Sequence, residues 1–177
     1  FASDEKIDLS IDIAERELEI LKKIDYENGY SLYIGIPFCP TTCLYCSFTS
    51  YPLVSWRQKV DSYLDALEKE LDYVAVKFGK KHLNSIYIGG GTPTTLEPYQ
   101  LDRLIRKIRC SFDLSHCLEF TVEAGRPDSI TREKLETLKK WDITRISINP
   151  QTMKDETLKI IGRRHTVAQT VESFQLA

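Results

Sequence analysis

The sequence lacks any long apolar run and any excess of charge of one sign. Its 177 residues include 24 lysines and arginines against 26 aspartates and glutamates, a formal net charge of −2. Without a basic run, the chain offers no electrostatic footprint for nucleic acid or anionic lipid. No apolar stretch approaches the roughly 20 residues that cross a bilayer, and residues 1–24 are charged throughout, unlike a signal peptide. We expect a cytoplasmic protein that neither binds nucleic acid nor spans a membrane.

Cysteine is also scarce, and its distribution excludes a conventional disulfide framework. The chain has five cysteines, an odd number, and three of them lie within eight positions as Cys39, Cys43 and Cys46. Cys110 and Cys117 stand apart from this group. In a reducing compartment, such clustering favours metal or redox chemistry over disulfides. The remaining composition, 42% hydrophobic and 28% charged, is that of an ordinary globular domain.

Short apolar runs alternate with helical patterns along the chain. Apolar residues recur at helical spacing over residues 4–24, behind a candidate cap at Ser3, and over residues 56–78. Strand-like runs occupy residues 31–36, 85–89, 118–123 and 145–149. Helical patterns follow the last three of them, at residues 98–109, 131–141 and 166–176. This order predicts an α/β fold with right-handed crossovers, a parallel sheet, and functional loops at the carboxyl ends of the strands.

Four strands are too few to close a barrel, so we expect the chain to end before its fold is complete. We interpret residues 1–30 as an N-terminal helix that leads into the domain, and residues 31–177 as the N-terminal part of that domain.

The three clustered cysteines follow the pattern CxxxCxxC in "IPFCPTTCLYC", residues 36–46. A structural zinc site normally uses four protein ligands, often as paired knuckles, and no second knuckle is present. Three thiolates on a four-iron, four-sulfur cluster would leave one iron open for chemistry. A zinc site or three free thiols remains the alternative on the triplet alone.

The stretch "LYIGIPFCPTTCLYCSF", with Tyr45 just before the last cysteine, resembles the signature of the radical S-adenosylmethionine superfamily. It is most similar to the oxygen-independent coproporphyrinogen III oxidase family. Gly35 and "VEAGRPDSIT" resemble the HemZ-type branch of that family. The resemblance extends from about Ser31 to His165 and implies a partial TIM-like (β/α) barrel, with about four of six expected strands. It also implies two cofactors, a 4Fe-4S cluster and S-adenosyl-L-methionine.

The resemblance also implies a role for particular residues. The cluster ligands are expected to be Cys39, Cys43 and Cys46. The positions that match cofactor contacts of the family are Tyr33, Tyr45, Gly90, Gly91, Thr92, Glu123, Gln151 and Arg163.

The residue types suit these roles. The glycines of "GGGTPT" let the backbone approach a small ligand, and no lysine follows them as it would in a phosphate loop. An acidic side chain such as Glu123 at a strand end is costly unless it is paired or bound to a ligand. Arg163 can pair bidentately with a carboxylate. Arg126 remains unassigned between a substrate propionate and a loop cap, and no catalytic residue is assigned.

The expected function is a radical S-adenosylmethionine oxidoreductase of haem biosynthesis, which decarboxylates coproporphyrinogen III propionates to vinyl groups. Its expected partners are a porphyrinogen substrate and an electron donor for the cluster. The family's dehydrogenases have histidine at the place of Gly35 and a further cysteine at the place of Phe48. These departures put the substrate in doubt and leave open a cluster-containing protein of haem binding or transfer. A zinc-binding structural domain is the second alternative, on the cysteine triplet alone.

Overall fold

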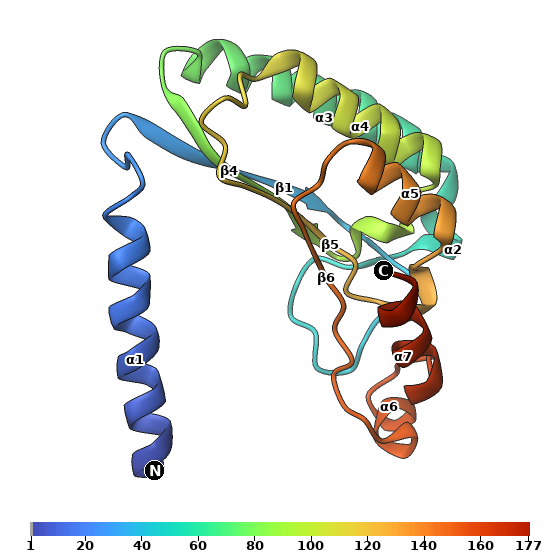
Figure 1. The fold of residues 1–177 in the computed structure, drawn as a ribbon. Helices are drawn as coiled ribbons and strands as arrows, with labels where there is room; N and C mark the ends of the chain where they lie inside the picture. The colour runs from blue at the N-terminus through green and yellow to red at the C-terminus, as the bar shows by residue number, and fades with distance from the viewer. Residues whose placement is uncertain (1) are drawn as a thin grey trace.

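The computed structural model describes residues 2–177 and contains a four-stranded parallel sheet. The strands run in the order β1 (Gly29–Ile36), β4 (His82–Gly90), β5 (Glu119–Glu123) and β6 (Arg145–Ser147). Each strand pairs in parallel with the next one in this order (Figure 1). The predicted α/β fold with a parallel sheet is confirmed.

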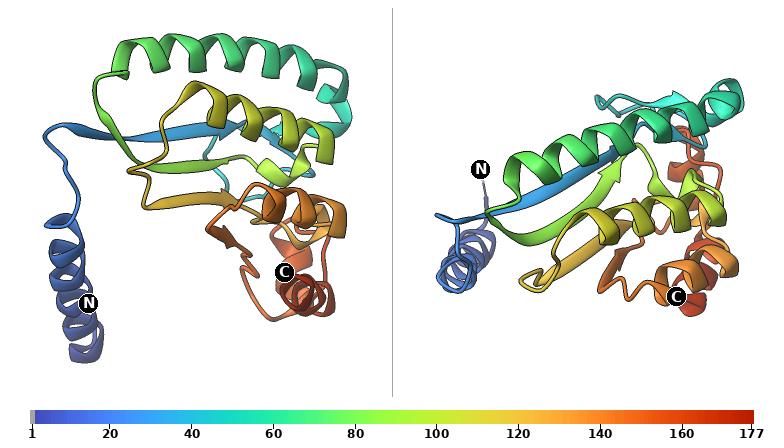
Figure 2. Two further views of the ribbon diagram at one scale, coloured as in Figure 1. Left: turned by 45° about the horizontal axis from the view of Figure 1, so that its top comes forward. Right: turned by 90° about the horizontal axis from the view of Figure 1, so that it is seen from above.

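Three helices cover one face of this sheet (Figure 2). They are α3 (Val60–Phe78), α4 (Pro98–Ser111) and α5 (Arg132–Lys140). Because side chains alternate between the two faces of a strand, Ile34 and Ile36 of β1 are buried under the helices while Tyr33 is exposed on the other face. The helices contribute apolar residues at helical spacing, including Leu64, Leu104 and Leu138.

The opposite face of the sheet is polar and uncovered. Ser31 and Ser85 are hydrogen-bonded across β1 and β4 at 2.8 Å, and the rings of Tyr33 and Tyr87 stack with centroids 5.9 Å apart. Arg145 of β6 forms an ion pair at 3.3 Å with a glutamate of β5. Helices outside and an unclosed sheet inside are the arrangement of a partial (β/α) barrel, as the sequence predicts.

Several elements differ from the sequence-based expectation. The helix predicted from residue 56 is divided into α2 (Leu53–Trp56), a 3₁₀ turn η1 (Arg57–Lys59) and α3. The strand predicted over 145–149 ends at Ser147, because its partner β5 ends at Glu123 in the same register. The short parallel pair β2 (Phe38–Cys39) and β3 (Tyr51–Pro52), and the helix α6 (Asp155–Ile160), were not predicted.

The first helix, α1 (Asp4–Leu21), forms behind Ser3 as predicted, although the Ser3 side chain makes no capping bond. Its apolar residues are exposed, and none of its side chains is buried. In all three figures α1 stands apart from the sheet and its covering helices. The amphipathic pattern therefore predicted the helix correctly. Within residues 2–177, however, no other element buries its apolar side chains.

The last helix, α7 (Val167–Leu176), begins at a capping box formed by Thr166 and Gln169. It contacts the 3₁₀ turn η3 (Pro127–Ser129), which follows β5. Over residues 2–177, no helix combines the length and apolar character needed to cross a bilayer.

Candidate active site

The carboxyl ends of the four strands meet at one edge of the sheet, where they enclose a cavity of about 200 Å³. Parallel strands place their following loops at the same edge, which explains why segments distant in sequence converge there. The cavity is lined by Cys39, Thr41, Cys43, Tyr45, Cys46, Phe48, Ser50, Gly90, Gly91, Thr92, Glu123, Gly125, Arg126, Asn149, Gln151 and Arg163.

All three clustered cysteines and all but one of the predicted cofactor contacts line this cavity. The exception is Tyr33, which lines an adjoining space of about 240 Å³. The two spaces share Phe48, Gly90 and Gly91 as lining residues, so Tyr33 lies beside the site and not across the molecule from it.

The three cysteines lie in residues 39–50, the cysteine loop, which joins the short strands β2 and β3. None of the three thiols is in a disulfide. Cys39 is buried, whereas Cys43 and Cys46 are half-buried and joined by a backbone bond from the Cys46 N–H to the Cys43 carbonyl at 3.1 Å. Within residues 2–177, no three cysteine, histidine or acidic side chains are grouped as a single metal ion would require. Ligands of an iron–sulfur cluster bind different irons, so they stand farther apart than ligands of one ion.

The glycine loop after β4 lies directly against Cys39. Gly90 has a φ of +107°, and the Gly91 N–H donates to the Ile36 carbonyl at 2.7 Å. A Cβ atom on Gly91 would lie 2.9 Å from the Cys39 sulfur, which is closer than real Cβ atoms approach. Thr92 donates its hydroxyl hydrogen to the same sulfur at 3.5 Å. The loop therefore needs glycine here to bring its backbone to the cysteine.

Glu123, at the end of β5, has a hydrogen-bond partner, as an acidic side chain in this position requires. The Tyr87 hydroxyl of β4 donates to the Glu123 carboxylate, and Tyr87 in turn stacks on Tyr33 of β1. Burial, followed by the bond to Glu123, raises the pKa of Tyr87 to about 12. Tyr87 thus stays a neutral hydrogen-bond donor at physiological pH. Sequence reasoning missed this residue because its partner comes from another strand.

Arg163 lies in the cavity wall with unused donors. Only 8% of the residue is exposed, and its Nη2 donates to the Tyr45 hydroxyl at 2.9 Å. Its Nε and Nη1 are buried without a hydrogen-bond partner in residues 2–177. A buried guanidinium with unpaired N–H groups costs free energy unless a ligand such as a carboxylate accepts from it. The cavity therefore suits an anionic group at Arg163.

Two residues that the sequence left without a role are buried in the same region: Arg126 lines the cavity, and His165 lies two residues after Arg163. His165 is buried with neither ring nitrogen hydrogen-bonded among residues 2–177, and burial lowers its pKa. Arg126 is buried and contacts the cysteine loop. A single sequence contains no signal that links residue 126 to residues 41–43, because the contact depends on how two loops meet at the sheet edge.

Comparison with known proteins identifies the family. The family model described as "Radical SAM superfamily" matches residues 33–177. The chain is 45% identical over 179 residues to "Oxygen-independent coproporphyrinogen-III oxidase-like protein HemZ" of Bacillus subtilis, covering 98% of the chain and 36% of the relative. It is 44% identical over 151 residues to "Heme chaperone HemW" of the same organism, covering 83% of the chain and 38% of that relative.

Among solved structures, the fold is similar to that reported as "Coproporphyrinogen III oxidase (HemN) from Escherichia coli is a Radical SAM enzyme". The TM-score is 0.76 at 30% sequence identity, and the match covers 85% of this chain and 34% of the other. The chain therefore spans about a third of the length of the relatives that it matches.

The residues present fit the cofactors of this family. Three free thiols line one cavity, the glycine loop places backbone beside Cys39, and Arg163 has unpaired donors for a carboxylate. The chain belongs to the radical S-adenosylmethionine superfamily, whose cofactors are a 4Fe-4S cluster and S-adenosylmethionine.

Proposed function

We propose that Cys39, Cys43 and Cys46 hold three irons of a 4Fe-4S cluster and that S-adenosylmethionine binds at the fourth iron. The observation that supports this best is the convergence of the three thiols and the unpaired Arg163 on one cavity. Thiolates are the usual cluster ligands, and a fourth cysteine does not line this cavity.

Held by these three thiolates, a reduced cluster would supply the one electron needed to cleave bound S-adenosylmethionine into methionine and a 5'-deoxyadenosyl radical. The chain's residues bind and orient the cofactor. The Arg163 guanidinium would pair with the methionine carboxylate, and the backbone around Gly90 and Gly91 would accommodate the amino group. Glu123, held by Tyr87, would accept a hydrogen bond from the ribose or the methionine portion.

Tyr33, Tyr45 and Gln151 complete the proposed cofactor contacts. Tyr45 is held by Arg163 and presents its ring to the nucleoside beside the cluster ligands. Tyr33 reaches the nucleoside from the adjoining space. Gln151 has a φ of +64°, a conformation uncommon outside glycine, and lines the cavity from the loop after β6.

The proposed substrate is a porphyrinogen of the coproporphyrinogen III type, because two of the relatives carry this substrate in their names. They are the oxidase-like protein HemZ and the oxidase HemN. Each reacting propionate would give one hydrogen atom from its β carbon to the 5'-deoxyadenosyl radical, which would become 5'-deoxyadenosine. The propionate would then lose carbon dioxide and one electron, which leaves a vinyl group. The reaction needs an electron donor for the cluster and an acceptor for the released electron.

We further infer that residues 31–177 form the first part of a longer barrel, with residues 1–30 leading into it. A cytoplasmic location is supported by five free cysteines, which suit a reducing compartment.

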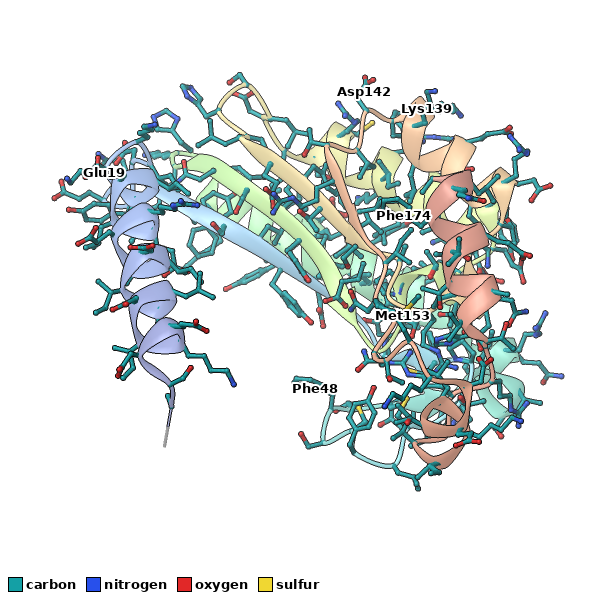
Figure 3. The ribbon with its side chains drawn as sticks, turned by 60° about the horizontal axis from the view of Figure 1, so that its bottom comes forward. Glu19, Phe48, Lys139, Asp142, Met153 and Phe174 are labelled. Atoms are coloured by element: carbon teal, nitrogen blue, oxygen red, sulfur yellow. The ribbon has the colours of Figure 1, made fainter. Side chains whose placement is uncertain are left out.

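A second candidate is haem binding or transfer without oxidation of coproporphyrinogen. It is favoured by the 44% identity to a protein named as a haem chaperone. It is also favoured by Phe48, which stands where the family's dehydrogenases have a further cysteine. Figure 3 shows the Phe48 side chain projecting from the cysteine loop into open space, and 76% of the residue is exposed.

Turnover of the full-length protein tests the proposal. The protein is reconstituted anaerobically with iron and sulfide, reduced with dithionite, and supplied with S-adenosylmethionine and coproporphyrinogen III. We expect release of 5'-deoxyadenosine together with vinyl-containing product, and loss of both in Arg163→Met. Stoichiometric haem binding with no decarboxylated product would favour the haem-transfer candidate. Absence of both iron and 5'-deoxyadenosine would refute radical chemistry.

A further inference from the structure

Arg126 is the most deeply buried charged residue at the candidate site. Only 3% of it is exposed, in the loop between β5 and η3. A guanidinium at this depth is stable only if charged or polar groups accept from most of its N–H donors. The identity of those acceptors therefore indicates what the residue does.

One side of Arg126 is held by a carboxylate two residues away. Its Nε donates to Asp128 Oδ1 at 3.1 Å and its Nη2 to Asp128 Oδ2 at 2.9 Å. This is a bidentate pair, which fixes the plane of the guanidinium as well as its position. Asp128 also offsets part of the positive charge.

The other side of Arg126 faces the cysteine loop. Its Nη1 donates to the Thr41 carbonyl at 3.2 Å and to the Cys43 sulfur at 3.6 Å, and its Nη2 donates to the Thr41 hydroxyl at 3.0 Å. One buried guanidinium thus binds both the backbone before Cys43 and the thiol itself. A lysine could not make this set of contacts, because its ammonium is a single point of donation.

The segment that carries Arg126 is itself tied to the glycine loop. The Ser129 hydroxyl donates to the Arg126 carbonyl at 2.7 Å and lies 2.6 Å from the Thr94 hydroxyl. The buried Lys134 ammonium of α5 donates to the Thr94 carbonyl at 2.7 Å and to the Ser129 carbonyl at 3.2 Å. The contacts therefore link α5 and the glycine loop, through Arg126, to the cysteine loop.

We propose that Arg126 is a positioning residue that fixes Cys43 for cluster binding and raises the reduction potential of the cluster. The inference rests on the proposed assignment of Cys43 as a ligand. Reduction adds one negative charge to the cluster, so a nearby cation and a hydrogen bond to a ligand sulfur favour the reduced state. Outer partners of ligands commonly affect metal affinity by about 10–100-fold.

The test compares the reconstituted full-length protein with Arg126→Gln, Arg126→Lys and Asp128→Asn. The matched control is Arg132→Gln, which changes an exposed arginine at the start of α5. Iron per chain is measured after desalting, and the midpoint potential of the cluster is measured by anaerobic titration followed by electron paramagnetic resonance. Thermal unfolding of each variant confirms that it is folded.

We expect Arg126→Gln to retain iron about 10-fold more weakly than wild type and to shift the midpoint potential to a more negative value. Arg126→Lys should lower iron retention clearly but shift the midpoint potential only slightly. Lysine preserves the positive charge but lacks the several N–H donors of the guanidinium. Asp128→Asn should shift the potential in the positive direction, since it removes a negative charge and leaves Arg126. Arg132→Gln should match wild type.

The opposite signs for Arg126→Gln and Asp128→Asn separate this role from general damage to the loop. Shifts of the same sign, or an unchanged potential and iron content in Arg126→Gln, would overturn the inference. If Arg126→Gln fails to fold, the sign of the Asp128→Asn shift decides. A wild-type protein that binds no iron–sulfur cluster would instead refute the proposed function on which the inference rests.

Discussion

At the scale of single residues, Gly91 has no room for a side chain between Cys39 and the Phe38 carbonyl. The sequence predicted close approach of the glycine loop to a ligand, and the structure adds that the loop also packs on a thiol. The cysteine triplet and the glycines were predictable because their spacing is local. Tyr87 and Arg126 were not, since each of them contacts residues on another strand or loop.

Substitution of Gly91 by alanine should displace Cys39. The added methyl group would lie 2.9 Å from the Cys39 sulfur and 2.7 Å from the Phe38 carbonyl oxygen. We expect Gly91→Ala to lower the free energy of unfolding by about 1–3 kcal/mol and to reduce iron content after reconstitution. Gly35→Ala is the control, because its Cβ would meet only the edge of the Tyr33 ring at 3.5 Å. Equal iron content and stability in the two variants would contradict the described contact.

Asp102 on α4 should make stability depend on pH at the acidic end. Its carboxylate accepts from Lys140 at 2.7 Å, from the Trp141 indole at 2.9 Å and from Arg106. The bonds from Lys140 and then Trp141 lower its pKa from the usual 3.8 to about 2. Because the pKa is lower in the folded state, the stabilisation is present above about pH 4 and is lost as the pH falls through about 2.

The stabilisation at neutral pH is about 1–2 kcal/mol, reduced by the exposure of Lys140 to water. Urea unfolding of wild type and Asp102→Asn between pH 2 and pH 7 measures it. The difference between the two should be largest above pH 4 and should shrink toward pH 2. Asp12→Asn on the exposed face of α1 is the control. A difference between wild type and Asp102→Asn that is constant with pH would show that Asp102 does not titrate in this way.

At the scale of elements, the strands of the main sheet and the longer helices were predicted, whereas the short elements outside this sheet were not. The sheet strands and the covering helices each have an apolar face that alternates at period 2 or 3.6. The pair β2 and β3 contains two residues per strand, too few to show any period. Likewise α6 has six residues. These short elements position the cysteine loop and Arg163, so local pattern is weakest near the site.

A pair of leucines tests which helices belong to the packed core. Leu64 of α3 is 1% exposed and Leu18 of α1 is 59% exposed. Leu64→Ala should lower the free energy of unfolding by about 2–5 kcal/mol, because it removes buried methyl groups and leaves a cavity. Leu18→Ala should change it by less than about 0.5 kcal/mol. Chemical denaturation of both variants measures this, and a comparable loss in Leu18→Ala would show that α1 packs against the domain in solution.

At the scale of the whole molecule, the sheet presents two chemically different faces. The covered face is aliphatic, as in the core of any α/β domain. The uncovered face bears serines, tyrosines, glutamates and Arg145, where a fully packed barrel would have branched apolar residues. Such a face suits a barrel whose interior binds a ligand. The sequence predicted the alternation that builds this sheet, but the polar contacts across it depend on the strand register.

The proposed function of the whole molecule depends on the binding of a cluster with one open iron by three cysteines. The most direct measurement is the iron content and the electron paramagnetic resonance spectrum of the reconstituted, reduced full-length protein. The two are recorded with and without S-adenosylmethionine, for wild type, Cys43→Ser and the exposed-cysteine control Cys110→Ser.

We expect about four irons per chain in wild type and Cys110→Ser, with a spectrum that changes when S-adenosylmethionine binds the open iron. Cys43→Ser should lose most of its iron. Zinc in place of iron, a spectrum indifferent to S-adenosylmethionine, or a cluster retained by Cys43→Ser would contradict the account.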